Sequence, residues 1–143
     1  MSGVHVMDML TRIRNACAVQ HRYVDVINTG TTRRIAKILV NEKFILSFDP
    51  VADHLANPKY LRLYLKYTTP QGELGLKKKA VIQSIKAVST PGRRVYVNTK
   101  DQAWQNALKK SSGLAILSTS QGVLTQYQAI ERNIGGEILC YIN

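Results

Sequence analysis

The sequence predicts an α+β protein made of two small α/β lobes. Segments of helical and strand periodicity alternate along its 143 residues, and 45% of the residues are hydrophobic, which is enough for a core without disulfides. A Pro-Gly turn at residues 91–92 separates the two parts. We expect an N-terminal lobe of helix, strand, helix and strands at residues 1–86, and a C-terminal lobe with a small antiparallel sheet and helices at residues 87–143.

The N-terminal lobe is expected to begin with an amphipathic helix. Its apolar residues recur at spacings of three and four, and they are Val6, Met9, Leu10, Ile13, Ala16 and Cys17. This pattern leaves Thr11, Arg14 and Asn15 on the flank away from the core. These three side chains therefore face something other than the protein core. The alternation at residues 23–27 predicts the first strand.

A second helix is expected next, capped by Thr31 or Thr32 and burying residues such as Ile35. Strands are predicted at residues 44–48 and 60–67. In the second of these strands, leucines share one face, while tyrosines and cations alternate on the other. That polar face fits two interpretations, a surface for a phosphate backbone or an ordinary solvated sheet face.

In the C-terminal half, the pattern again alternates. It predicts strands at residues 80–88, 95–97, 114–117 and 137–142, and helices at residues 101–109 and 122–132. Arg93 and Arg94 follow the Pro-Gly turn, and a Gly135-Gly136 turn precedes the last strand.

The charge is strongly basic and unevenly distributed. Twenty Lys and Arg against nine Asp and Glu give a net charge of +11, which indicates nucleic acid or an anionic membrane surface as the partner. Residues 54–110 contain twelve of the basic and two of the acidic residues, including the run Lys77, Lys78 and Lys79. Apolar residues at strand spacing within this region exclude a disordered basic tail.

Other features limit the compartment and the partner. Cys17 and Cys140 are far apart in sequence, which favours two reduced thiols. The apolar runs fall short of the roughly eighteen residues that a membrane span requires, so we expect no membrane-spanning segment. The first residues resemble neither a signal peptide nor a transit peptide; a protein of an organelle would then be made there or have been processed.

Three consecutive hydroxyls, Ser118, Thr119 and Ser120, end the strand at residues 114–117. One hydroxyl would be enough to cap a following helix, so two are left over. One interpretation is an anion-facing edge that bonds to phosphates, riboses or base edges. The alternative is an ordinary turn, because Ser and Thr are common there.

Four stretches resemble the family of small-subunit ribosomal protein eight in its bacterial-type form, found in bacteria, plastids and mitochondria. They are MDMLTRIRNA at residues 7–16, STPGRRVY at 89–96, STSQGVLTQYQAI at 118–130 and NIGGEILCYI at 133–142. Their order and spacing also agree with the family, and the resemblance covers nearly the whole chain.

The resemblance implies a two-lobed protein that binds the central domain of small-subunit ribosomal RNA directly and early in assembly, without catalytic activity. Neighbouring small-subunit ribosomal proteins would be its other partners, and a membrane would not be one. The positions expected to contact RNA are Ser118, Thr119, Ser120, Gly122, Gly135, Gly136, Glu137, Tyr96, Arg93, Arg94, Thr11, Arg14 and Asn15, together with Lys77, Lys78 and Lys79 from the charge pattern.

The chain also departs from the family pattern. Gln121 replaces the basic residue that usually follows Ser-Thr-Ser, and Asn143 replaces the common aromatic C-terminus. The charged residues usual in the last helix are replaced by the uncharged stretch QYQAI at residues 126–130. A frequent Gly-x-Gly is replaced at residues 111–113. These departures question the charge contacts of the last helix and favour an organellar ribosome, mitochondrial or plastid, over a bacterial one.

The chain lacks the residue patterns that other function classes require. The carboxylates are scattered, the histidines have no metal-ligand spacing, and Ser118 and Ser120 lack the setting of a catalytic nucleophile. We therefore expect no enzyme, cofactor, metal or small-molecule substrate. A free RNA-binding regulator of similar fold is the remaining alternative, and RNA binding outside the ribosome would distinguish it.

Overall fold

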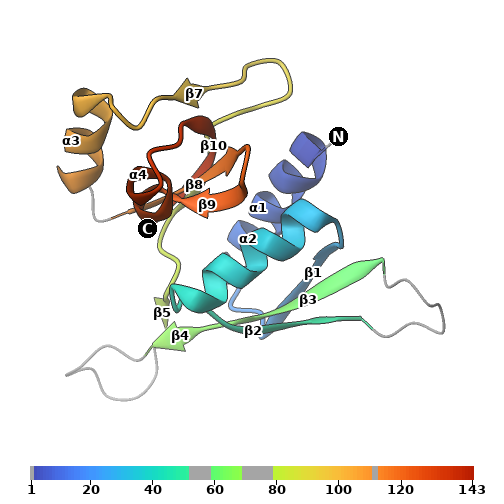
Figure 1. Cartoon of the computed structure of the whole chain (residues 1–143). Coiled ribbons are helices and arrows are strands. Elements are labelled where there is room, and N and C mark those ends of the chain that lie inside the picture. Colours follow the sequence, from blue (N-terminus) through green and yellow to red (C-terminus); the bar gives the residue numbers. More distant parts are fainter. Residues whose placement is uncertain (1, 52–58, 69–78, 111–112) are drawn as a thin grey trace.

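The computed structural model describes residues 2–51, 59–68, 79–110 and 113–143 (Figure 1). The first half of the chain contains α1 (Ser2–Ala18), β1 (Tyr23–Ile27), α2 (Gly30–Asn41), β2 (Ile45–Pro50), β3 (Tyr60–Leu65), β4 (Tyr67–Thr68) and β5 (Lys79–Ala80). The second half contains β6 (Ile85–Ala87), β7 (Tyr96–Val97), α3 (Gln102–Lys110), β8 (Leu114–Thr119), β9 (Gly122–Thr125), α4 (Gln126–Glu131) and β10 (Gly136–Ile142). The arrangement is α+β in two lobes, as expected.

The N-terminal lobe packs α1 and α2 on one face of an antiparallel sheet of order β1-β3-β2. Leu61, Leu63 and Leu65 of β3 are buried under these helices, which confirms the predicted alternation. On the opposite face, Arg62 forms an ion pair of 2.9 Å with Asp25 and lies 4.2 Å from the centre of the Tyr23 ring. The carboxylate of Asp25 raises the pKa of this guanidinium.

The expected cap of the second helix was placed too late in the sequence. Thr29, not Thr31 or Thr32, is the N-cap of α2, and its hydroxyl accepts a hydrogen bond from the Thr32 amide. Thr32 completes the capping box and is buried, with its hydroxyl donating to the Ile27 carbonyl over 2.7 Å. The helix starts earlier because this reciprocal pair satisfies two backbone groups at its end.

The C-terminal lobe contains a sheet of order β6-β10-β8-β9, with β7 also paired to β10. The predicted strand at residues 80–88 is interrupted, because only β5 and β6 are formed there. Between them, the amides of Gln83 and Ser84 donate to the carbonyl of Asn143, so this segment bonds to the end of the chain.

The helix expected at residues 122–132 is wrong in its first part. Gly122 to Thr125 form β9, which pairs with β8 in a hairpin, and α4 begins only at Gln126. Gly122 has a φ of +104°, which permits the tight turn. The N-cap is Thr125, in a capping box with Gln128. The three hydroxyls at 118–120 therefore precede a strand, not a helix.

One large apolar cluster joins the two lobes. It contains residues of α1, α2 and β3 together with Ile85 of β6, Ile116 of β8 and Cys140 of β10. Arg14 of α1 adds a polar contact, since its guanidinium donates to the carbonyl of Ile85, with 3.1 Å from Nε. β6 (Ile85–Ala87) spans the expected boundary between residues 86 and 87 and pairs with β10 of the C-terminal sheet. A division of the chain at residue 86 stays a prediction.

Among the described residues, no helix is long and apolar enough to cross a membrane. Cys17 is half-buried and Cys140 is buried, and no disulfide joins them.

Candidate nucleic-acid interface

The turn between β8 and β9 is closed by only one of its three hydroxyls. Thr119 Oγ1 donates to the carbonyl of Gly122 over 2.8 Å and accepts from the amide of Gln121 over 3.2 Å. Ser120 is exposed and Ser118 is half-buried, and within the described chain neither hydroxyl has a hydrogen-bond partner. Thr119 therefore closes a hairpin and caps no helix, while the hydroxyls of Ser118 and Ser120 are open to an external ligand.

The Gly-Gly-Glu turn lies directly against this hairpin. A Cβ atom built on Gly136 would lie 2.4 Å from the carbonyl oxygen of Ser118, and one on Gly135 would lie 2.6 Å from the carbonyl oxygen of Val97. Both glycines are thus required for close backbone approach, rather than for a left-handed conformation. The structure brings these two sequence motifs, 118–122 and 135–137, into one site.

A row of three residues crosses the sheet at this end. Glu137 of β10 is paired with Ser118 of β8 on one side and with Tyr96 of β7 on the other. Paired residues of antiparallel strands point to the same face, so these three side chains share one face of the sheet. Tyr96 is 70% exposed, so its ring is accessible for stacking on a base or ribose.

The two arginines after the Pro-Gly turn differ in their surroundings. Arg94 Nη1 forms an ion pair of 3.0 Å with Glu137, so it compensates the one carboxylate in the row. Arg93 is exposed, and its backbone pairs with Thr90 to close the turn. Both lie beside the strand that carries Tyr96.

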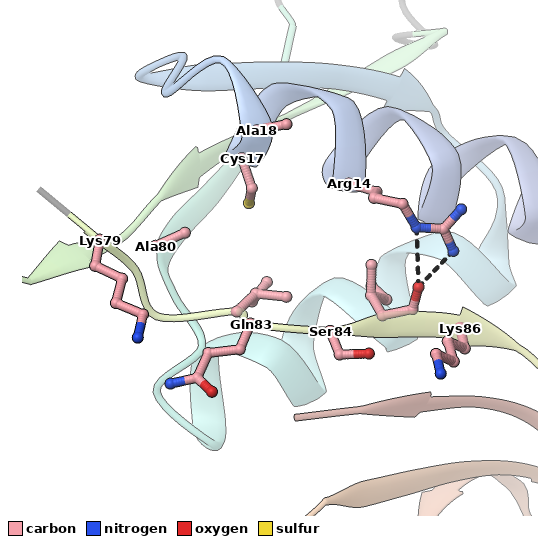
Figure 2. Close-up of a pocket in the computed structure, with 10 residues that line it drawn as sticks. Arg14, Cys17, Ala18, Lys79, Ala80, Gln83, Ser84 and Lys86 are labelled. Atoms are coloured by element: carbon pink, nitrogen blue, oxygen red, sulfur yellow. Dashed lines mark hydrogen bonds between the residues drawn. The ribbon is translucent and has the colours of Figure 1, made fainter.

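The candidate residues of α1 lie in a second place. Thr11 and Asn15 are exposed, and the Thr11 hydroxyl donates within the helix to the Met7 carbonyl over 3.0 Å. Arg14 and Cys17 point from α1 toward residues 79–86 across an open groove of about 700 Å³ (Figure 2). Burial raises the pKa of the Cys17 thiol.

Of the predicted lysine run, only Lys79 can be placed. It is exposed and lines the same groove, whereas Lys77 and Lys78 lie outside the described residues. The described candidate residues thus lie in two places: the end of the C-terminal sheet with the neighbouring Pro-Gly turn, and α1 with Lys79 across the groove.

Two arginines that the sequence analysis did not single out also reach the β8–β9 turn. Arg34 of α2 approaches Gly122, and Arg132, just after α4, contacts Gln121. Sequence spacing gives no signal for Arg34, which is far from the turn along the chain. Arg132 follows the short helix α4 and could have been found only from a correct position of that helix.

Groups suited to metal binding are missing from the described part of the chain, where no three His, Cys, Asp or Glu residues come together. The site is instead a backbone-rich edge with hydroxyls, an exposed aromatic ring and guanidinium groups. Such an edge can donate and accept hydrogen bonds and stack, which are the contacts that suit an irregular RNA surface.

The fold and site thus define a basic α+β protein with a polar, hydroxyl-bearing sheet end. The family model described as ribosomal protein S8 matches residues 5–143, and the chain belongs to this family. Membership of a ribosomal protein family indicates a structural role in the ribosome.

Relatives of similar length support this assignment. The small ribosomal subunit protein uS8c of Gracilaria tenuistipitata is 45% identical over 96% of both chains. The uS8 protein of Rippkaea orientalis is 44% identical over 96% of this chain and 95% of its own, and uS8c of Rhodomonas salina is 42% identical over 96% of both. The plastid-type uS8c relatives favour an organellar over a bacterial source, and cyanobacterial relatives have nearly the same identity.

Proposed function

We propose that this chain is a structural component of the small ribosomal subunit that binds the central domain of the small-subunit ribosomal RNA directly. In this role it supports assembly of the subunit and translation, next to other small-subunit proteins. The observation that carries the proposal is the contact between the β8–β9 turn and the Gly-Gly-Glu turn, which gathers distant polar residues at one sheet end.

The chemistry of this sheet end supports RNA as the ligand. The hydroxyls of Ser118 and Ser120 can bond to riboses and phosphates, and Tyr96 offers a face for stacking. The chain's charge of +11 supplies long-range attraction to a polyanion. The relatives reported above are named small ribosomal subunit proteins, which directs the proposal to ribosomal RNA.

We expect the two lobes to divide the work. The sheet end of the C-terminal lobe would select an irregular RNA helix by shape and hydrogen bonding, while cations such as Arg93 and Lys79 would hold the neighbouring backbone. Thr11 and Asn15 of α1 would add polar contacts beside the groove.

A filter-binding titration tests the proposal. The purified full chain is titrated against a central-domain ribosomal RNA fragment and against a scrambled RNA of the same length, at several salt concentrations. We expect a clear preference for the real fragment. Replacing both Ser118 and Ser120 by Ala should reduce that preference with little change in salt dependence, because neutral hydroxyls release no counterions.

The matched control is Ser47→Ala, which removes an exposed hydroxyl from β2 in the N-terminal lobe. It should bind like the unaltered protein. Equal binding of the unaltered protein to both RNAs would contradict the proposal. Sedimentation of a tagged chain with small ribosomal subunits would separate the ribosomal role from that of a free RNA-binding regulator.

A further inference from the structure

The β8–β9 turn lacks cations of its own. Residues 113–131 contain neither Lys nor Arg, although the chain as a whole has a charge of +11. Phosphate contacts in protein–nucleic acid complexes come mainly from cationic side chains. A turn that approaches a phosphate backbone therefore needs cations from other parts of the fold.

The first such cation comes from the other lobe. α2 lies against β9, and Nη1 of Arg34 is 3.1 Å from the position that a Cβ on Gly122 would occupy. Arg34 is exposed, and within the described residues it has no carboxylate partner. Its guanidinium thus lies beside the turn with its charge uncompensated.

The second cation comes from the end of α4. Arg132 Nη1 donates a hydrogen bond of 3.2 Å to Oε1 of Gln121, and Arg132 is exposed, with no ion pair to the described carboxylates. Gln121 is a neutral acceptor, so it orients the guanidinium without cancelling its charge. Arg94 differs, because Glu137 compensates it.

Gln121 and Gly122 are adjacent in the turn, so the two guanidinium groups reach neighbouring positions of one short loop. We propose that Arg34 and Arg132 act as a phosphate clamp for the RNA strand that passes the turn, with Gln121 positioning Arg132. This inference rests on the proposed function. It makes the RNA site of the C-terminal lobe dependent on a residue of the N-terminal lobe.

The test is the salt dependence of binding to the central-domain RNA fragment for Arg34→Gln, Arg132→Gln and the double variant. Each single substitution should weaken binding and lower the salt slope by about one unit, and the double variant by about two. Arg34→Lys keeps the charge and should keep most of the slope. Gln121→Ala should weaken binding but lower the salt slope by less than a full unit, because Arg132 remains but is no longer oriented.

The matched control is Arg22→Gln. Arg22 lines a shallow groove with Tyr64 on the sheet face opposite the helices. Its substitution therefore removes the same charge from a different surface. Variants of Arg34 and Arg132 that bind like this control overturn the clamp. Circular dichroism of each variant confirms that the fold is retained.

The failures of the two proposals are distinguishable. If the unaltered protein does not prefer the ribosomal fragment over the scrambled RNA, the proposed function is wrong. If it does prefer the fragment while the arginine variants match Arg22→Gln, only the clamp is wrong.

Discussion

Gly136 allows the two turns of the candidate interface to approach each other closely. A methyl group there would lie 2.4 Å from a backbone oxygen of Ser118 and 2.9 Å from Cγ2 of Thr119. Gly136→Ala should therefore push β10 away from β8 and lower the free energy of unfolding by about 1–3 kcal/mol, as overpacking does. Urea denaturation measures this loss.

Gly92→Ala is the control for that substitution, because a Cβ at Gly92 would meet nothing within 4 Å. It should leave stability and RNA binding nearly unchanged. Equal stability of the two alanine variants would show that the close approach at Gly136 is not a constraint.

Cys140 is a second residue with a measurable consequence. Burial raises the pKa of its thiol to about 12, from 9.0 in an unfolded chain. Above pH 9 the unfolded chain loses a proton that the folded chain keeps, so the free energy of unfolding should fall as the pH rises from 9 toward 12. Burial also raises the pKa of Cys17 and Tyr67, which adds to the same trend.

Urea titrations at about pH 8 and about pH 10 measure this slope. Cys140→Ala should be less stable at both values but should show a weaker pH dependence. An unchanged pH dependence in that variant would mean that Cys140 does not cause the slope.

At the scale of elements, α4 depends on a cap that the sequence analysis placed elsewhere. Thr125 is buried and accepts a hydrogen bond from the Gln128 amide, while the Gln128 side chain accepts one from the Thr125 amide. Thr125→Ala should lower the free energy of unfolding by about 1 kcal/mol. The midpoint of thermal unfolding reports the change.

Ser120→Ala is the comparison that separates structure from binding. Ser120 is exposed and caps no helix, so its removal should affect RNA binding and leave the thermal midpoint unchanged. A large loss of stability in Ser120→Ala would show that this hydroxyl has a structural role.

At the scale of the whole molecule, the shared apolar cluster should make the lobes unfold together. Ile116 of β8 is fully buried in the cluster that also contains Leu39 of α2 and Leu63 of β3. Ile116→Ala should lower the free energy of unfolding by about 2–5 kcal/mol. The fluorescence of Trp104 and hydrogen exchange of the β1 amides should report the same loss in both lobes.

Leu46→Ala is the matched control, since Leu46 is 60% exposed and its truncation leaves no cavity. Two separate transitions in the Ile116→Ala protein, one for each lobe, would contradict cooperative unfolding across the cluster.

Much of the fold follows from the sequence by itself. Local periodicity was sufficient for α1, for β1 at residues 23–27, and for the buried leucines of β3, because these elements place apolar side chains on one face. The sequence also contains the motif residues of the candidate interface, and the order and spacing of these motifs indicated the family.

The tertiary structure alone decided the elements whose local signals were ambiguous. The apolar pair Val123 and Leu124 fits a helix or a strand, and pairing with β8 made residues 122–125 a strand. The caps at Thr29 and Thr125 depend on reciprocal side-chain bonds whose register a sequence does not display.

The composition of the candidate interface was also decided at this level. Ser118, Glu137 and Tyr96 meet through strand register. Arg34 of the N-terminal lobe reaches Gly122 in the adjoining β8–β9 turn. The physical reason is the same in each case: local periodicity determines which face of an element is buried, whereas neighbours distant in sequence are chosen by long-range pairing and by packing of the shared core.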